Sequence, residues 1–365
     1  MKQSSLHTQH ETLGAHFQPI GDWEMPEHYG QTTEEHLVVR QGVGIADLSH
    51  RGINRVTGDD RTTWLQSLIS NDILPLTVGH GLYSALMDHK GKMLSYFRVF
   101  LLDDSIILED TGEVGDLTFQ ALRKFLLFGT KAKMENCLES WGTLLIAGPS
   151  APELVKQALS VDLSETKPLS FQKTDVEGHS VMLVKTEETG EHDIEILMPI
   201  AALVPVWNQL WSVGQPLGLR AVGHAALESL RIEAGIPKLG PDLNDRIVPP
   251  EANLEGKAFS LTKGCYPGQE VVARMDTYGA VKRRLVGLLL NSEDHRLPEP
   301  GAKIFSGDRE VGWISSTAYS PTFNKPIALG FPLRDFTKAD TELAIQVGET
   351  RIAAIVQSLP FSRSS

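Results

Sequence analysis

The sharpest local pattern in this chain is the octet Lys263-Gly264-Cys265-Tyr266-Pro267-Gly268-Gln269-Glu270, which is followed by Arg274. Pro267 and Gly268 suit the two central positions of a type II turn, because proline presets φ and glycine accepts a positive φ. The octet therefore predicts a tight turn just after a thiol.

The thiol of Cys265 has the surroundings of a reactive cysteine. Gly264 removes bulk beside it, and the nearby cations Lys263 and Arg274 favour the thiolate, which is the nucleophilic form. Free cysteines are also among the most buried residues, so a buried Cys265 in a turn that joins two domains is the alternative.

Composition limits the class of protein. The chain has 365 residues, of which 41% are hydrophobic and 22% charged, and this predicts two or three packed domains. A net charge of −12 argues against direct DNA binding, which needs a basic face. The two cysteines, Cys137 and Cys265, form no CxxC pair, and the histidines show no ligand spacing, so we expect no metal site. Such sparse cysteines fit a reducing cytoplasm.

Neither the N-terminus nor the longest apolar run predicts a membrane segment. Residues 1–20 contain no apolar signal core, and the run 196–207 holds Pro199 and Pro205 and is shorter than the roughly 20 residues that a spanning helix needs. We expect a soluble cytoplasmic protein with no membrane partner.

Hydrophobic periodicity places the main elements before residue 280. It predicts a hairpin around the turn 88–91, and in the strand 193–198 it sets Ile194 and Ile196 on one face and Glu195 on the other. Helices are predicted at 59–71, 117–128, 151–159, 203–211 and 224–234.

The chain after about residue 281 has a different pattern. Short apolar strands are separated there by Gly, Pro and Asp, which is typical of a small antiparallel barrel. We therefore predict a domain of residues 1–280 and a barrel domain of residues 281–365. The strands expected in the barrel are 285–290, 303–305, 311–315, 327–331, 343–347 and 352–356.

The octet resembles the signature of the YgfZ-type, folate-binding branch of the glycine-cleavage T-protein (aminomethyltransferase) superfamily. Its matching residues are Lys263, Gly264, Cys265, Tyr266, Gly268, Gln269 and Glu270, with Arg274 beyond them. Further landmarks of the superfamily resemble the stretches 21–26, 47–52, 70–72, 147–149, 189–191 and 230–235. The resemblance implies an α+β, three-lobed folate-binding fold with two interleaved α/β lobes and a C-terminal antiparallel β-barrel.

The resemblance also implies a tetrahydrofolate site, for that cofactor or a one-carbon derivative. Glu195 matches the carboxylate that grips the pterin, and Arg231 matches an arginine near the ligand tail. The other positions implied to line the ligand are Arg51, Tyr83, Tyr96 and Phe100. Alternatives remain: Glu195 on an exposed strand face, Arg231 paired with Glu228 or Glu233, and Tyr83 and Phe100 in the core.

One departure decides between branches of the superfamily. T-proteins that transfer a methylene carry an Asp pair where this chain has Ser95 and Tyr96, and neither residue is a base near neutral pH. With the octet, this implies an accessory protein for assembly or repair of iron–sulfur enzymes, including tRNA-modifying ones, with such clients or assembly proteins as partners. Cys265 and Lys263 are its candidate catalytic residues.

Two other functions stay open. The shared scaffold allows a tetrahydrofolate-dependent aminomethyltransferase of glycine cleavage or a related demethylation partner. A folate-responsive regulatory protein without chemistry of its own is the third reading, so the sequence leaves open whether the chain is an enzyme.

Overall fold

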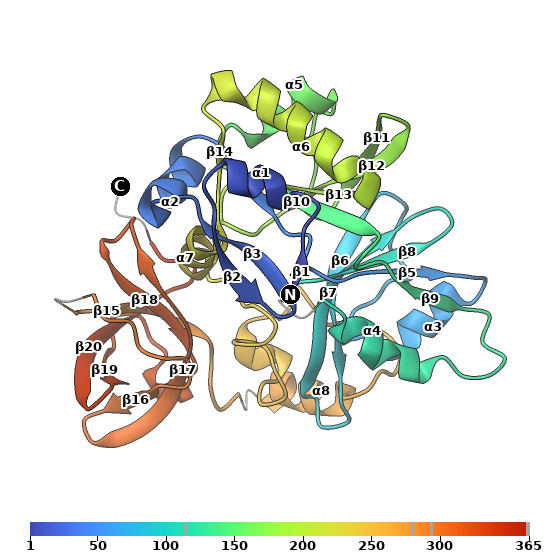
Figure 1. The fold of residues 1–365 in the computed structure, drawn as a ribbon. Helices are drawn as coiled ribbons and strands as arrows, with labels where there is room; N and C mark the ends of the chain where they lie inside the picture. The colour runs from blue at the N-terminus through green and yellow to red at the C-terminus, as the bar shows by residue number, and fades with distance from the viewer. Residues whose placement is uncertain (113–114, 279–280, 293–294, 363–365) are drawn as a thin grey trace.

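Two mixed lobes and a barrel form the part of the chain that the computed structural model describes, residues 1–112, 115–278, 281–292 and 295–362 (Figure 1). This is the predicted α+β, three-lobed architecture. The domain boundary predicted at residue 280 lies outside the described residues and stays a prediction. No helix in the described part has the length and apolar character needed to cross a bilayer.

The first lobe is built on a six-stranded sheet in the order β11-β12-β13-β10-β4-β14. Helices α5 (Ala151–Leu159) and α6 (Ile200–Gly214) pack on one of its faces. The alternation predicted for β13 is confirmed, because Ile194 and Ile196 join this core whereas Leu197 lies in the core on the opposite face. The strands are β4 (Gly44–Asp47), β10 (Trp141–Ala147), β11 (Phe171–Val176), β12 (His179–Thr186), β13 (Asp193–Pro199) and β14 (Arg220–Ala221).

The second lobe is built on a five-stranded sheet in the order β6-β7-β8-β5-β9. Helix α3 (Arg61–Leu68) covers one face, where Trp64 and Leu65 pack in the same core as Phe97 of β7. The predicted hairpin is confirmed as β6 and β7. The strands are β5 (Ile53–Thr57), β6 (Gly81–Met87), β7 (Met93–Leu101), β8 (Ile106–Asp110) and β9 (Lys133–Asn136).

The chain passes between the two sheets twice. It forms β4 in the first sheet, leaves to build β5 to β9 in the second, and returns as β10, which pairs antiparallel with β4. The predicted interleaving of the two lobes follows from this path.

The helix predicted over 117–128 is shorter than expected. Helix α4 (Leu117–Leu122) continues only as the 3₁₀ turn η1 (Arg123–Phe125). Beyond it Leu127 and Phe128 are exposed by 72% and 110%, so the apolar residues that suggested a longer helix have no core to face.

The inner faces of the two sheets share a core. Phe100 of β7 meets Phe171 of β11 edge to face, with ring centroids 6.1 Å apart, and Leu197 of β13 belongs to the same cluster. Residues of β7 and β13 therefore face each other between the lobes.

The N-terminal segment adds a small sheet in the order β1-β3-β2. Helix α7 (His224–Ala234) spans the predicted residues 224–234, and Gly235 after it takes a left-handed φ of 71°. The remaining elements outside the barrel are β1 (Lys2–Gln3), β2 (His16–Ile20), β3 (Trp23–His28), α1 (His7–Thr12), α2 (Thr32–Gln41), η2 (Gln215–Leu217), α7 (His224–Ala234), η3 (Pro249–Ala252) and α8 (Gln269–Tyr278).

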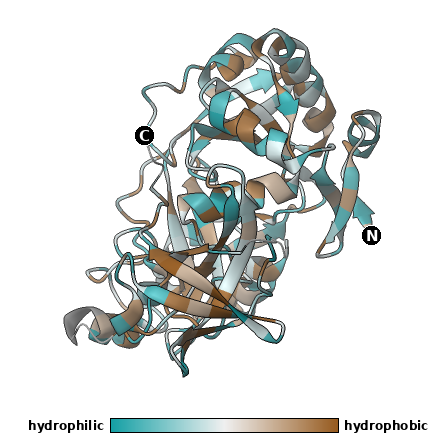
Figure 2. Cartoon of the chain, turned by 90° about the vertical axis from the view of Figure 1, so that its left-hand side faces the viewer, coloured by the Kyte–Doolittle hydropathy of each residue, from teal (hydrophilic) through white to brown (hydrophobic). Residues whose placement is uncertain are grey.

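The C-terminal strands close into the predicted antiparallel barrel, in the order β15-β18-β17-β16-β19-β20. Figure 2 shows hydrophobic and hydrophilic residues interspersed along its strands, as expected when one side of each strand faces the barrel interior. Its elements are β15 (Val286–Leu290), β16 (Lys303–Ser306), β17 (Arg309–Ser320), β18 (Lys325–Gly330), η4 (Arg334–Phe336), β19 (Glu342–Val347) and β20 (Thr350–Gln357).

Candidate functional site

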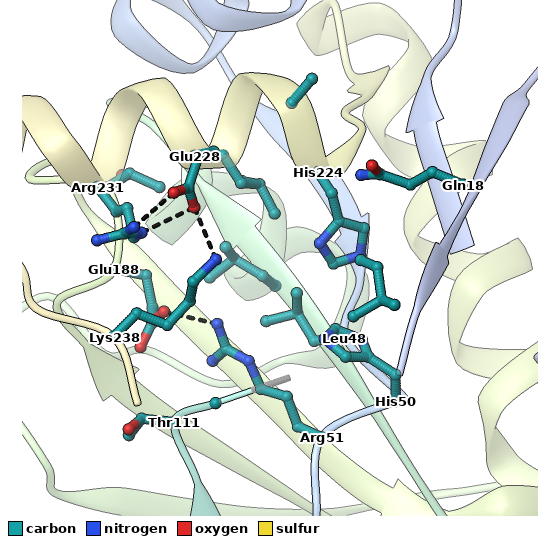
Figure 3. Close-up of a pocket in the computed structure, with 16 residues that line it drawn as sticks. Gln18, Leu48, His50, Arg51, Thr111, Glu188, His224, Glu228, Arg231 and Lys238 are labelled. Atoms are coloured by element: carbon teal, nitrogen blue, oxygen red, sulfur yellow. Dashed lines mark hydrogen bonds and ion pairs between the residues drawn. The ribbon is translucent and has the colours of Figure 1, made fainter. Parts of the chain in front are cut away.

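A cavity of about 250 Å³ lies where the two mixed lobes meet helix α7. Its wall carries charged side chains from three separate segments: Arg51 after β4, Glu188 before β13, and Glu228 and Arg231 on α7 (Figure 3). Lys238 donates to Glu228 at 2.8 Å across the same wall. The cavity is therefore polar and lined by both signs of charge.

Glu195 lies behind this wall. Its side chain is fully buried on the inner face of β13 and does not line the cavity. Arg98 Nη2 donates to its Oε2 at 2.7 Å, and Arg51 Nη1 contacts its Oε1 at 3.4 Å. The alternative of an exposed Glu195 is thus excluded, and Arg51 stands between Glu195 and the cavity.

Sequence reasoning named Arg51 near Glu195 but missed Arg98, Glu109 and Glu188. Arg98 of β7 is the cross-strand partner of both Tyr83 on β6 and Glu109 on β8, so the three side chains form a row across the sheet. Arg98 Nη2 lies 3.0 Å from Glu109 Oε2, and its Nη1 lies 3.3 Å from Glu188 Oε1. The signal in the sequence was the charged residue Arg98 within the apolar strand β7, together with Glu109 near the end of β8.

The buried charges balance if Glu109 carries a proton. Burial raises the pKa of Glu109 well above its usual range despite the nearby Arg98 charge. Burial also acts to raise the pKa of Glu188, but the charges of Arg51 and Arg98 outweigh it and lower this pKa to about 2. Two guanidinium groups then face the two carboxylates of Glu188 and Glu195.

Tyr83 and Tyr96 form a stacked pair beside this cluster. Their ring centroids are 5.4 Å apart with an interplanar angle of 9°, and Lys257 Nζ lies 4.5 Å from the centre of the Tyr83 ring. Burial raises the pKa of both phenols, so neither is a base near neutral pH. Both rings are nearly fully buried.

Ser95 faces away from this cluster. Its hydroxyl bonds to Thr118 of α4, which donates in turn to Asp110. Burial raises the pKa of Asp110 to about 8. Of the two positions that replace the Asp pair, only Tyr96 shares a strand face with Arg98.

Arg231 is held by its own protein. It donates to both oxygens of Glu228 at 2.5 and 2.8 Å, to Asp242 at 2.8 Å and to Ser316 of the barrel strand β17 at 2.7 Å. The alternative pairing with Glu228 is therefore present, although Arg231 also lines the cavity. Phe100 lies in the core between the sheets with no exposure. Ligand contact by either residue stays a prediction.

The octet forms the predicted turn away from the cavity wall. Gly268 has a φ of 80°, and Gln269 N–H donates to Tyr266 C=O at 3.3 Å. A Cβ on Gly268 would lie 2.7 Å from Asp88 C=O, so the turn also needs glycine for close packing. No octet residue lines the cavity.

The two candidate catalytic residues of the octet have different surroundings. Cys265 is an exposed free thiol, which excludes the buried alternative. Lys263 is buried, and its Nζ donates to the backbone carbonyls of Gln66, Ile69 and Asn71 at the end of α3, at 2.6 to 2.9 Å. Burial lowers the pKa of Lys263 to about 8. Their catalytic roles stay predictions.

Comparison with known proteins identifies similar chains over the full length. Residues 6–261 match the family model of the GCVT N-terminal domain, and residues 283–362 match the glycine cleavage T-protein C-terminal barrel domain. Proteins named aminomethyltransferase from Saccharopolyspora erythraea and Desulforamulus reducens are 30% and 31% identical, each match covering 99% of this chain and 98% of the relative.

A solved structure agrees with these matches. The crystal structure of glycine cleavage system aminomethyltransferase T from Bartonella henselae is 25% identical and superposes with a TM-score of 0.89, covering 99% of this chain and 98% of that one. The predicted accessory role in iron–sulfur assembly or tRNA modification is wrong. These relatives are named aminomethyltransferase, which favours the alternative function instead. Matched from its N-terminal lobes through its barrel, the chain belongs to the glycine cleavage T-protein family.

Proposed function

We propose that this chain is a tetrahydrofolate-dependent aminomethyltransferase. The observation that carries the proposal is a carboxylate pair at a cavity between the lobes of a T-protein fold, with Glu188 in the cavity wall and Glu195 buried behind Arg51. The full-length similarity to proteins named aminomethyltransferase supports it. The placement in the YgfZ-type branch has no support beyond the octet and Ser95-Tyr96.

The residues present fit a reduced folate as substrate. A pterin ring offers N–H donors, which require an acceptor carboxylate, and Glu195 and Glu188 supply two. The stacked Tyr83 and Tyr96 are nearly fully buried and do not line this cavity, so contact of their rings with the ligand stays a prediction. Lys238 at the cavity wall offers a cation for the anionic tail. We infer that Glu188, Glu195 and Lys238 bind the substrate.

The reaction would move one carbon. The aminomethyl group of an S–CH₂–NH₂ donor loses its bonds to sulfur and nitrogen, and its carbon bonds to two folate nitrogens. The two N–H protons of folate end on the departing ammonia and the free thiol, so protons balance. Positive charge develops on the transferred carbon, so an anionic group on that side of the pterin would stabilise the transition state.

Ser95 and Tyr96 stand where methylene-transferring T-proteins carry an Asp pair, so a direct assay of methylene transfer decides the proposal. We expect methylene-tetrahydrofolate to form from an aminomethyl-loaded lipoyl carrier and tetrahydrofolate, with a loss of at least about 100-fold in Glu195→Gln. The matched control is Glu135→Gln, which changes an exposed glutamate on β9 and should keep full activity. A wild-type chain without turnover in the presence of the loaded carrier would end the proposal.

A further inference from the structure

Arg51 occupies the approach from the cavity to Glu195. It lines the cavity with 12% of its side chain exposed, whereas Glu195 behind it is fully buried. Figure 3 shows the Arg51 side chain extending along the cavity wall toward Glu188. A ligand in the cavity therefore meets the guanidinium of Arg51 before it can meet the carboxylate of Glu195.

The hold of Arg51 on the two carboxylates is uneven. Its Nη2 donates to Glu188 at 2.9 Å, a normal charge-assisted bond, but its Nη1 lies 3.4 Å from Glu195, beyond the usual range. Glu195 keeps a close partner in Arg98 at 2.7 Å through its other oxygen. Release of Arg51 would thus leave Glu195 paired and one of its oxygens free to accept.

Glu188 and Glu195 together form an acceptor edge, and its shape indicates which donor groups a ligand must carry. Two carboxylates joined by one guanidinium accept planar N–H donors that diverge from a single carbon. The 2-amino edge of a reduced pterin carries the same arrangement of donors as a guanidinium. Arg51 and such an edge cannot occupy the position together.

We propose that Arg51 competes with the ligand for Glu188 and Glu195, and that it must swing away before a guanidine-shaped edge can bind. For a pterin, this rests on the proposed function. The apparent dissociation constant then equals the intrinsic one divided by the fraction of molecules in which Arg51 has moved. The proposal reverses the role implied by family resemblance, in which Arg51 contacts the ligand.

Calorimetric titration with 5-formyl-tetrahydrofolate, a stable reduced folate, gives opposite results for the two roles. Arg51→Met should bind at least about tenfold tighter than wild type, which corresponds to about 1.4 kcal/mol. Arg51→Lys keeps the charge without the planar fork and should also bind more tightly, so it preserves the test if Arg51→Met does not fold. Arg55→Met, whose guanidinium pairs with the exposed Asp104, is the matched control and should bind like wild type. Weaker binding by the Arg51 variants would overturn the proposal.

A second probe separates this inference from the proposed function. Methylguanidinium should raise the melting temperature of Arg51→Ala but not of wild type or Arg55→Ala, because only the first leaves the acceptor edge empty. If no chain bound the folate and methylguanidinium still stabilised Arg51→Ala, the aminomethyltransferase proposal would fall while the competition stood. No shift with Arg51→Ala would overturn the competition itself.

Discussion

Arg98 Nη2 lies 2.7 Å from Glu195 Oε2, and this ion pair joins β7 of one sheet to β13 of the other. Both side chains are fully buried. Because a buried charge without a partner is strongly destabilising, the pair makes the relative position of the two lobes depend on the same residues that form the back of the candidate site.

Arg98→Met should therefore destabilise the protein severely. Among the described residues, the substitution leaves Arg51 as the remaining ion-pair partner of Glu195 and Glu188. We expect a loss of about 3–5 kcal/mol in the free energy of unfolding. Urea denaturation at neutral pH measures it. Arg55→Met removes an exposed pair and should cost less than about 1 kcal/mol. An equal effect of the two substitutions would contradict the structural role of Arg98.

Glu109→Gln should be nearly neutral at pH 7. The amide resembles the protonated carboxyl that burial favours, so the charge balance around Arg98 is kept and the change should stay below about 1 kcal/mol. The carboxyl C=O stretch of Glu109 in an infrared difference spectrum of wild type against this variant reports the proton directly. A carboxylate band at pH 7 instead would show that Glu109 is ionised.

Asp110→Asn should flatten the dependence of stability on pH. With a folded pKa of about 8, Asp110 stays protonated in the folded state while it ionises in the unfolded state above about pH 4. The unfolded state then binds fewer protons, so wild-type stability falls as pH rises from about 4 to about 8, by up to about 1.4 kcal/mol per pH unit. Denaturation midpoints at pH 5 and pH 8 should differ less in the variant. If the midpoints at pH 5 and pH 8 differed as much in the variant as in wild type, a group other than Asp110 would cause the pH dependence.

Lys263→Met should destabilise the protein, whereas Cys265→Ser should leave its stability nearly unchanged. Lys263 donates to three carbonyls at the end of α3, and its loss should cost about 2–3 kcal/mol of unfolding free energy. The exposed Cys265 should tolerate serine within about 0.5 kcal/mol. Thermal denaturation of both variants checks the contrast. A destabilised Cys265→Ser would show that the thiol is part of the packing.

Local sequence patterns predicted several of the elements correctly. The structure confirms the alternation of β13, the hairpin of β6 and β7, the helix over 224–234 and the closely spaced barrel strands. Each of these features depends on residues near in sequence. The failure at 123–128 has the same cause, since periodicity records apolar residues but not whether a core lies opposite them.

Residues near in sequence were enough to predict part of the helices and strands and the turn at Gly268, and family resemblance pointed to the carboxylate at position 195. The packing of the lobes and the barrel, by contrast, set the partners of the charged residues. Arg98 and Arg51 hold that carboxylate, Lys263 binds carbonyls at the end of α3, and Arg231 is bound by Glu228, Asp242 and Ser316. Most of these contacts join residues 85 to 197 positions apart, and periodicity cannot assign such partners because they depend on how the sheets and the barrel pack.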